Sequence, residues 1–187
     1  MTDKDCKQAS AEAESVAGEL FQLAALLLAD EAAAVTAVEQ TLAAVETDPC
    51  LEPERARRIT EEQLVQTALA WIQERKSGCL AATEEDAIGA GGCVDTDDLS
   101  AAGLTEAQLQ EMLSHSDRAG LRLWLESLAP AQRVIFVLRA VLGRSNAQAA
   151  EELLRAGCIG WTESLAGNSF RGALCSVTRS LLHAVAV

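Results

Sequence analysis

The sequence predicts an all-α protein made of two small helical bundles, the second of them helix-turn-helix-like. Alanine and leucine dominate the 187 residues, while aromatic residues make up only 3%, with no Tyr and 3 Pro. This composition favours helices, because the β-branched and aromatic residues typical of strands are scarce. Apolar residues also recur at steps of three and four along most of the chain.

The charge distribution divides the chain. Residues 1–117 contain 7 basic and 24 acidic residues, whereas residues 118–187 contain 8 arginines and 4 carboxylates. The total net charge of −13 argues against nucleic-acid binding, but the arginine surplus of the second part does not. The split indicates two domains with different partners.

The first domain is expected at residues 1–78, with a frayed polar start at 1–9. The first helix, 10–29, has an apolar stripe at Val16, Leu20, Leu23 and Leu27. The second begins at Asp30-Glu31, where acidic residues suit the helix dipole, and stops at Thr47-Asp48-Pro49. Its predicted buried stripe is Val35, Val38, Leu42 and Val45.

The third helix is predicted to start at a capping box formed by Thr60 and Gln63, and to end near Gly78. A basic cluster precedes it, in a segment expected to be a linker. The cluster comprises Arg55, Arg57 and Arg58.

Residues 79–104 read as an acidic, glycine-containing linker, because apolar periodicity is missing there. Asp95, Asp97 and Glu106 match three positions of an EF-hand loop. Leu99 and Ser100, however, replace an oxygen ligand and the turn glycine, so we expect a solvated acidic segment and no calcium site.

The second domain is expected at residues 105–187. A capping box of Thr105 and Gln108 starts one helix, and Asp117 caps the next. The second of these helices has an apolar face made of Leu121, Trp124, Leu125 and Leu128.

Residues 125–154 predict two helices joined by a tight turn. Pro130 suits a first helical turn, and Gly143 supplies a left-handed helix end. Ser145 and Gln148 form a capping box that starts the next helix, which has a narrow face of small residues. A helix that starts so soon after a glycine stop is typical of the first half of a helix-turn-helix.

The same residues resemble the C-terminal DNA-binding domain of bacterial RNA polymerase sigma factors, especially the extracytoplasmic-function class. The resemblance is carried by Leu128-Ala-Pro130-Ala-Gln-Arg133-Val134, Leu138-Arg139, Gly143 and Gln148-Ala-Ala-Glu-Glu-Leu153. In the N-terminal part, the segment 30–40 resembles the family's polymerase-binding helix, and Ala70-Trp71-Ile72 resembles its tryptophan helix.

The sequence departs from the family after residue 155. Residues 156–167 are longer than the family's turn, so the last helix is expected from Asn168 or Ser169, with an apolar stripe at Phe170, Leu174, Val177 and Leu181. Arg171 fills the family's lysine position, but Ala173 and Ser176 replace the arginines that follow.

The resemblance implies contacts with RNA polymerase core and with duplex DNA, and leaves room for a regulatory partner protein. The implied polymerase-binding residues are Asp30, Glu31, Glu39 and Gln40. The implied DNA-binding residues are Arg144, Ser145, Gln148, Asn168, Ser169, Arg171 and Arg179. The alternative is a protein-binding regulatory module that keeps the fold without reading DNA.

Other functional classes find little support in the sequence. His115 and His183 are far apart, and we find no nucleophile motif, phosphate-binding loop or metal-ligand pair, so we expect no enzyme, cofactor or metal. The 6 cysteines form no C-x-x-C pair and are expected as thiols. With no signal peptide and no membrane-length apolar run, we expect a cytoplasmic protein.

Overall fold

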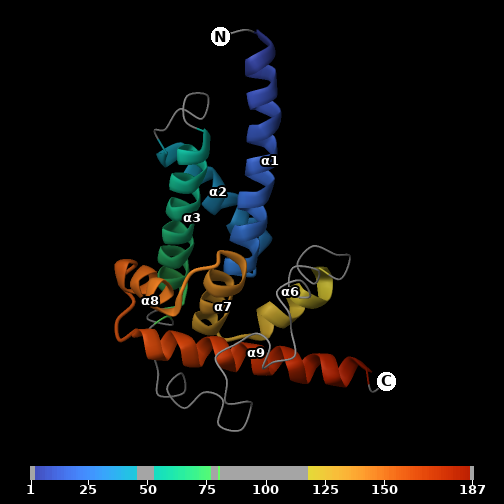
Figure 1. Ribbon diagram of the computed structural model, residues 1–187, viewed down its shortest axis with the longest axis vertical. Coiled ribbons are helices and arrows are strands. Elements are labelled where there is room, and N and C mark those ends of the chain that lie inside the picture. Colours follow the sequence, from blue (N-terminus) through green and yellow to red (C-terminus); the bar gives the residue numbers. More distant parts are fainter. Residues whose placement is uncertain (1–2, 46–52, 77–79, 81–117, 186–187) are drawn as a thin grey trace. The chain divides into compact units, whose positions relative to one another are not determined.

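In the computed structural model, the residues described are 3–45, 53–76, 80 and 118–185 (Figure 1). Every regular element among them is a helix, which confirms the predicted all-α class. The chain divides into unit 1, Met1–Arg75, and unit 2, Lys76–Val187. The helix expected from Thr105, the cap at Asp117 and almost all of the expected linker lie outside the described residues.

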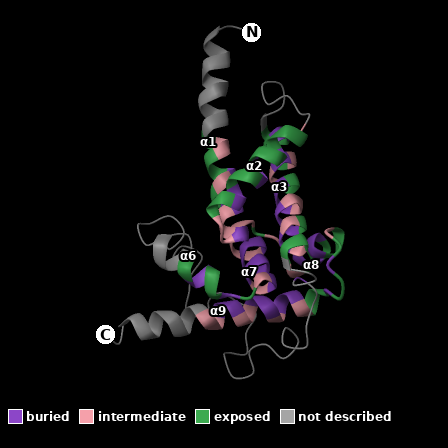
Figure 2. Cartoon of the chain, turned by 180° about the vertical axis from the view of Figure 1, so that it is seen from behind, coloured by how far each residue is buried: buried purple, intermediate pink, exposed green. Residues whose placement is uncertain are grey.

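Unit 1 contains helices α1 (Asp3–Leu28), α2 (Glu31–Ala44) and α3 (Pro53–Lys76) in its described part. Helix α1 starts at Asp3, seven residues earlier than expected. All three helices bury one face in a shared interior (Figure 2). The larger side chains in this interior are Leu20, Leu23, Leu27, Leu28, Leu64, Val65, Leu69 and Ile72.

Helix α2 starts where the sequence predicted, but it buries a different face. The Asp30 side chain accepts a hydrogen bond from the Ala33 amide at 3.0 Å and so caps the helix. The predicted stripe is wrong at Val35 and Leu42, which are 46% and 49% exposed. The buried residues are Ala33, Ala34, Ala37, Val38 and Thr41. Small side chains on this face allow α1 and α2 to pack closely along each other.

Helix α3 starts at Pro53, so the predicted capping box at Thr60 is wrong. Proline suits a first helical turn, because its missing N–H has no partner there in any helix. Thr60 lies inside the helix and is buried, and its hydroxyl donates to the Ala56 carbonyl at 2.7 Å. The cluster of Arg55, Arg57 and Arg58 therefore lies on α3, on its exposed side, and not in a linker.

Unit 2 contains helices α6 (Arg118–Ser127), α7 (Pro130–Phe136), α8 (Asn146–Arg155) and α9 (Glu163–Val185) in its described part. A π-helical segment, η2 (Val137–Val141), directly continues α7. Pro130 occupies the first turn of α7, as predicted. Helix α9 runs across one side of this unit and packs against both α7 and α8 (Figure 1).

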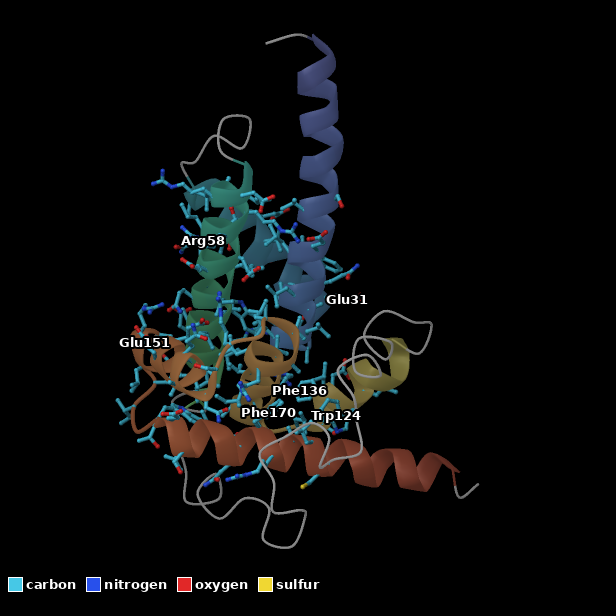
Figure 3. All side chains as sticks on the ribbon, viewed as in Figure 1. Glu31, Arg58, Trp124, Phe136, Glu151 and Phe170 are labelled. Carbon is cyan, nitrogen blue, oxygen red and sulfur yellow. The ribbon has the colours of Figure 1, made fainter. Side chains whose placement is uncertain are left out.

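The interior of unit 2 centres on α7 and the start of η2, where every residue from Arg133 to Leu138 is buried. Three aromatic rings connect its helices. Trp124 of α6 meets Phe136 of α7 edge-on, with ring centroids 4.9 Å apart, and Phe136 lies 6.0 Å from Phe170 of α9 (Figure 3). The Trp124 indole also donates to the Ser176 hydroxyl at 3.2 Å. The ring contacts therefore fix α6 and α7 on α9.

Leu80 belongs to this interior, although the sequence placed it in the linker. Its side chain is fully buried, and its carbonyl accepts a hydrogen bond from the Trp161 indole. Trp161 itself is only 3% exposed.

In the described part of the chain, we find no helix with the length and apolar character needed to span a membrane.

Candidate nucleic-acid interface

The turn that leads into α8 starts from the π-helical segment η2. The Leu142 amide donates to the Val137 carbonyl at 3.2 Å, and the Arg144 amide donates to the Leu138 carbonyl at 2.9 Å. Gly143 is left-handed, with φ 62°, as predicted. The π-helical hydrogen bonding was not predicted, because apolar periodicity does not distinguish one widened turn from a regular α-helix.

Arg139, on η2, joins this turn to helix α9. Its Nη1 donates to the Arg144 carbonyl oxygen at 2.7 Å. Its guanidinium carbon lies 4.9 Å from the centre of the Phe170 ring, in a cation–π arrangement. One side chain thus contacts both the turn before α8 and the helix that follows α8.

Helix α8 begins with the predicted capping box. The Ser145 hydroxyl accepts from the Gln148 amide at 3.1 Å, and the Gln148 side chain accepts from the Ser145 amide at 2.8 Å. Both residues are exposed. Their side-chain oxygens satisfy two backbone amides at the N-terminus of α8, which is the end where the helix dipole favours an anion.

Arg144 precedes this capping box and is paired with Glu152 of α8. The distance from Arg144 Nε to Glu152 Oε1 is 3.0 Å, and the two side chains are 23% and 12% exposed. This ion pair is much less solvated than the Glu151–Arg155 pair on the outer side of the same helix, whose side chains are 68% and 57% exposed. The Glu152 carboxylate therefore partly neutralises the one arginine in the turn before α8.

The segment 156–167, which the sequence suggested as a long insertion, is mostly helix and tight turn. After α8, the Gly157 amide donates to Leu154 O and the Cys158 amide to Leu153 O, each at 2.9 Å, with Gly157 at φ 87°. This is a Schellman ending, in which the buried Cys158 follows the left-handed glycine. Ile159 stands out from the turn and is 74% exposed.

Helix α9 starts at Glu163, so the predicted start at Asn168 or Ser169 is wrong. The Leu165 amide donates to the Thr162 hydroxyl at 3.3 Å, and the Ala166 amide donates to the Thr162 carbonyl at 2.9 Å. Glu163 adds an acidic residue in the first turn, which the helix dipole favours. The start of α9 consequently presents a carboxylate, and Asn168 lies in the second helical turn.

The candidate DNA-binding residues on α9 do not share one environment. Ser169 is 2% exposed, so it cannot contact DNA in this structure, contrary to expectation. Asn168 and Arg171 are half-buried, and Arg171 Nη2 donates to Asn168 Oδ1. Arg179 belongs to α9, but its side chain lies outside the described residues.

Two glycines of α9 allow one side of the helix to pack so closely on α7 and α8 that DNA cannot reach it. A Cβ atom at Gly172 would lie 2.7 Å from Gln132 Nε2 of α7, and one at Gly167 would lie 3.0 Å from Asn146 Nδ2 of α8. Helix α9 therefore approaches both neighbours closely along this side. Ala166, Phe170 and Ala173 are buried with Ser169, and Phe170 and Leu174 are buried as predicted.

The two described cysteines of unit 2 differ in state. Cys158 is buried and is not part of a disulfide, as expected. Cys175 of α9 is disulfide-bonded, contrary to expectation, and its partner lies outside the described side chains. Pairing of cysteines depends on which of them the fold brings together, and their spacing in this sequence carries no such signal.

The candidate polymerase-binding residues lie at the start and along the exposed side of α2. Glu31, Glu39 and Gln40 are exposed, whereas Asp30 is half-buried at the cap and lies 3.7 Å from Arg75 Nη1. Val35 and Leu42 are exposed on the same helix. Sequence reasoning missed these two as surface residues, because their hydrophobicity predicted burial.

No protein-family model matches the chain, and no curated protein or solved structure matches it. Among the described residues, no three His, Cys, Asp or Glu side chains cluster in a way that could hold a metal ion.

Proposed function

We propose that this protein is a divergent sigma-factor-like transcription regulator, in which unit 1 binds RNA polymerase core and unit 2 contacts duplex DNA. The observation that carries the proposal is the succession of α8, a Schellman turn and α9, with α8 started by a capping box and α9 packed on α7 and α8. This succession is the order of elements in a helix-turn-helix.

The proposed DNA surface combines the start of α8 with the half-buried side of α9. Ser145 and Gln148 place the α8 N-terminus at the surface, where backbone amides suit a phosphate. Asn168 and Arg171 carry the polar groups that read base edges, with arginine best suited to guanine. Arg144 is a further phosphate ligand, whose charge the ion pair with Glu152 partly neutralises.

The proposed polymerase surface is the exposed face of α2. Glu31 and Glu39 give it negative charge, and Val35 and Leu42 add apolar area between and beyond the two acids. Such a face suits a partner surface that is basic and apolar at once.

A protein-binding module that does not read DNA is the second candidate, and two observations favour it. Glu163 places a carboxylate at the N-terminus of the candidate recognition helix, where reading helices contact the DNA. Ser169 is buried, which removes one of the expected contacts. In this reading, the α2 face binds a protein partner and α9 serves only the packing of unit 2.

Binding of the full chain to duplex DNA at increasing salt distinguishes the two candidates. A DNA-contacting unit 2 gives a linear fall of log affinity with log salt, with a slope of roughly −0.9 for each phosphate contact. We expect Arg171→Ala to weaken binding to the preferred duplex by about tenfold or more and to reduce the discrimination between duplexes. Arg58→Ala is the matched control, since Arg58 is an exposed arginine of α3 outside the proposed DNA surface.

Polymerase docking is tested separately, by sedimentation or pull-down of the full chain with purified RNA polymerase core. Glu39→Lys and Val35→Asp should each abolish binding, because they reverse a charge or bury a new one at the interface. Glu62→Lys, an equal charge reversal at an exposed position of α3, should leave binding intact. If the chain binds duplex DNA but not polymerase core, the proposed sigma-like role is wrong. If it binds core but not duplex DNA, the result supports the protein-binding module.

A further inference from the structure

A π-helical segment, η2, lies between α7 and the turn that leads into α8. Val137–Val141 form a five-residue π-helix, and π-helical segments are rare in proteins and occur frequently at functional sites. Three residues, Leu142 to Arg144, separate the end of this segment from Ser145, the first residue of the α8 capping box.

Arg139 lies in the middle of this π-helix, and its side chain reaches two other elements. It donates to the Arg144 carbonyl at 2.7 Å, in the residue next to the Ser145 cap. Its guanidinium also lies 4.9 Å above Phe170 of α9, a ring that contacts Phe136 of α7. A planar guanidinium suits both roles, because its faces stack on rings while its edges donate hydrogen bonds.

The Arg144 backbone receives a second restraint from the same π-helix. Its amide donates to the Leu138 carbonyl at 2.9 Å, so both polar groups of this peptide segment are bonded to η2 or to its side chain. The Arg144 side chain is in turn paired with Glu152 on α8. The residue directly before the α8 cap is therefore held by the Arg139 side chain, by the Leu138 carbonyl and by Glu152.

We propose that Arg139 is a positioning residue for the DNA-contacting surface, because it fixes the start of α8 against α9 through the Arg144 carbonyl and the Phe170 ring. This inference rests on the proposed function, in which the α8 start meets phosphates and α9 meets bases. A reading surface built from two helices requires a fixed distance between them.

The test uses two variants of the full chain. Arg139→Lys keeps the positive charge but loses the planar fork, and Arg139→Met keeps only the apolar stem. Both should weaken binding to the preferred duplex by about tenfold, with the slope of log affinity against log salt unchanged. A lost phosphate contact would instead reduce that slope by about one.

Amide hydrogen exchange supplies a readout that does not depend on DNA. Exchange at the Ser145 and Gln148 amides, the two donors of the capping box, should become at least tenfold faster in both variants. Exchange in α1 and α2 of unit 1 should stay as in the wild type. Arg155→Gln is the matched control, since Arg155 is an exposed arginine of α8 paired with Glu151, and it should leave capping-box exchange unchanged.

The outcomes separate this inference from the proposed function. Wild-type affinity in both Arg139 variants overturns the positioning role, as does a loss confined to Arg139→Met with a reduced salt slope, which would make Arg139 a phosphate ligand. If the wild-type chain binds no duplex, the proposed DNA contact fails. The exchange rates at Ser145 and Gln148 then still decide whether Arg139 fixes the start of α8.

Discussion

The indole nitrogen of Trp161 donates a hydrogen bond of 2.5 Å to the carbonyl oxygen of Leu80, 81 residues earlier in the chain. Both residues are almost completely buried. The bond joins the turn before α9 to a residue that lies four positions after Lys76, the last residue of α3. It therefore ties Leu80, which precedes all of the helices α6–α9, into the interior of unit 2.

Trp161→Phe should lower the free energy of unfolding of unit 2 by about 1–3 kcal/mol, because the Leu80 carbonyl loses its donor inside the protein. Urea denaturation followed by tryptophan fluorescence, in a Trp71→Phe background, reports on Trp124 of the same unit. Trp71→Phe alone provides the reference, since Trp71 lies on α3 and belongs to unit 1. If the double variant is as stable as Trp71→Phe alone, the Trp161–Leu80 hydrogen bond does not stabilise unit 2.

Ser169→Ala should leave duplex binding unchanged and should stabilise unit 2 slightly, by about 1 kcal/mol. The Ser169 hydroxyl is buried, and no atom of the described chain forms a hydrogen bond with it. An unsatisfied buried hydroxyl costs free energy, and replacing it with a methyl group removes that cost. Urea denaturation and duplex titration check both parts, and a clear loss of DNA affinity would restore Ser169 as a contact.

Glu152→Gln should strengthen duplex binding by several-fold and steepen its salt dependence by about one phosphate contact. The substitution removes the carboxylate that pairs with Arg144 at 3.0 Å, and the amide keeps nearly the same shape. Arg144 then carries its full charge toward a phosphate. The expected accompanying cost is a destabilisation of about 1–3 kcal/mol, because a largely buried ion pair is broken.

Glu151→Gln is the control for this effect. Glu151 is paired with Arg155 on the exposed side of α8, so its removal changes the net charge equally without affecting Arg144. If the Glu151 and Glu152 variants bind duplex DNA equally tightly, net charge alone explains the gain and Arg144 is not a phosphate ligand.

Local signals in the sequence predicted the parts of the fold that local interactions determine. The helix start at Asp30-Glu31, the left-handed Gly143 and the Ser145–Gln148 capping box are each defined by a few neighbouring residues, and each is confirmed. The helix start at Thr60 failed, because a Ser or Thr three residues before Gln also occurs inside helices, where its hydroxyl bonds the preceding turn.

The missed features of the candidate site depend on contacts that sequence spacing does not carry. Comparison with a family pattern placed the start of α9 at Asn168, although Thr162 and Glu163 provide a better helix start. The Arg139–Phe170 contact joins two separate elements, η2 and α9, and apolar periodicity does not distinguish the π-helix from a regular α-helix. Nothing in the local sequence distinguishes Ser169, which is buried, from Asn168, which is half-buried.

The exposed face of α2 leads to a prediction with a matched pair of substitutions. Val38 is 8% exposed and packs in the interior of unit 1, whereas Val35, one helical turn earlier, is 46% exposed. Val38→Ala should destabilise unit 1 by about 2 kcal/mol, because two buried methyl groups are lost and a cavity remains. Val35→Ala should cost less than about 0.5 kcal/mol, since alanine's higher helix propensity offsets the small loss of burial. Amide hydrogen exchange in α1 and α3 measures both effects, and equal destabilisation by the two substitutions would show that α2 buries the valine stripe expected from sequence and not its alanine face.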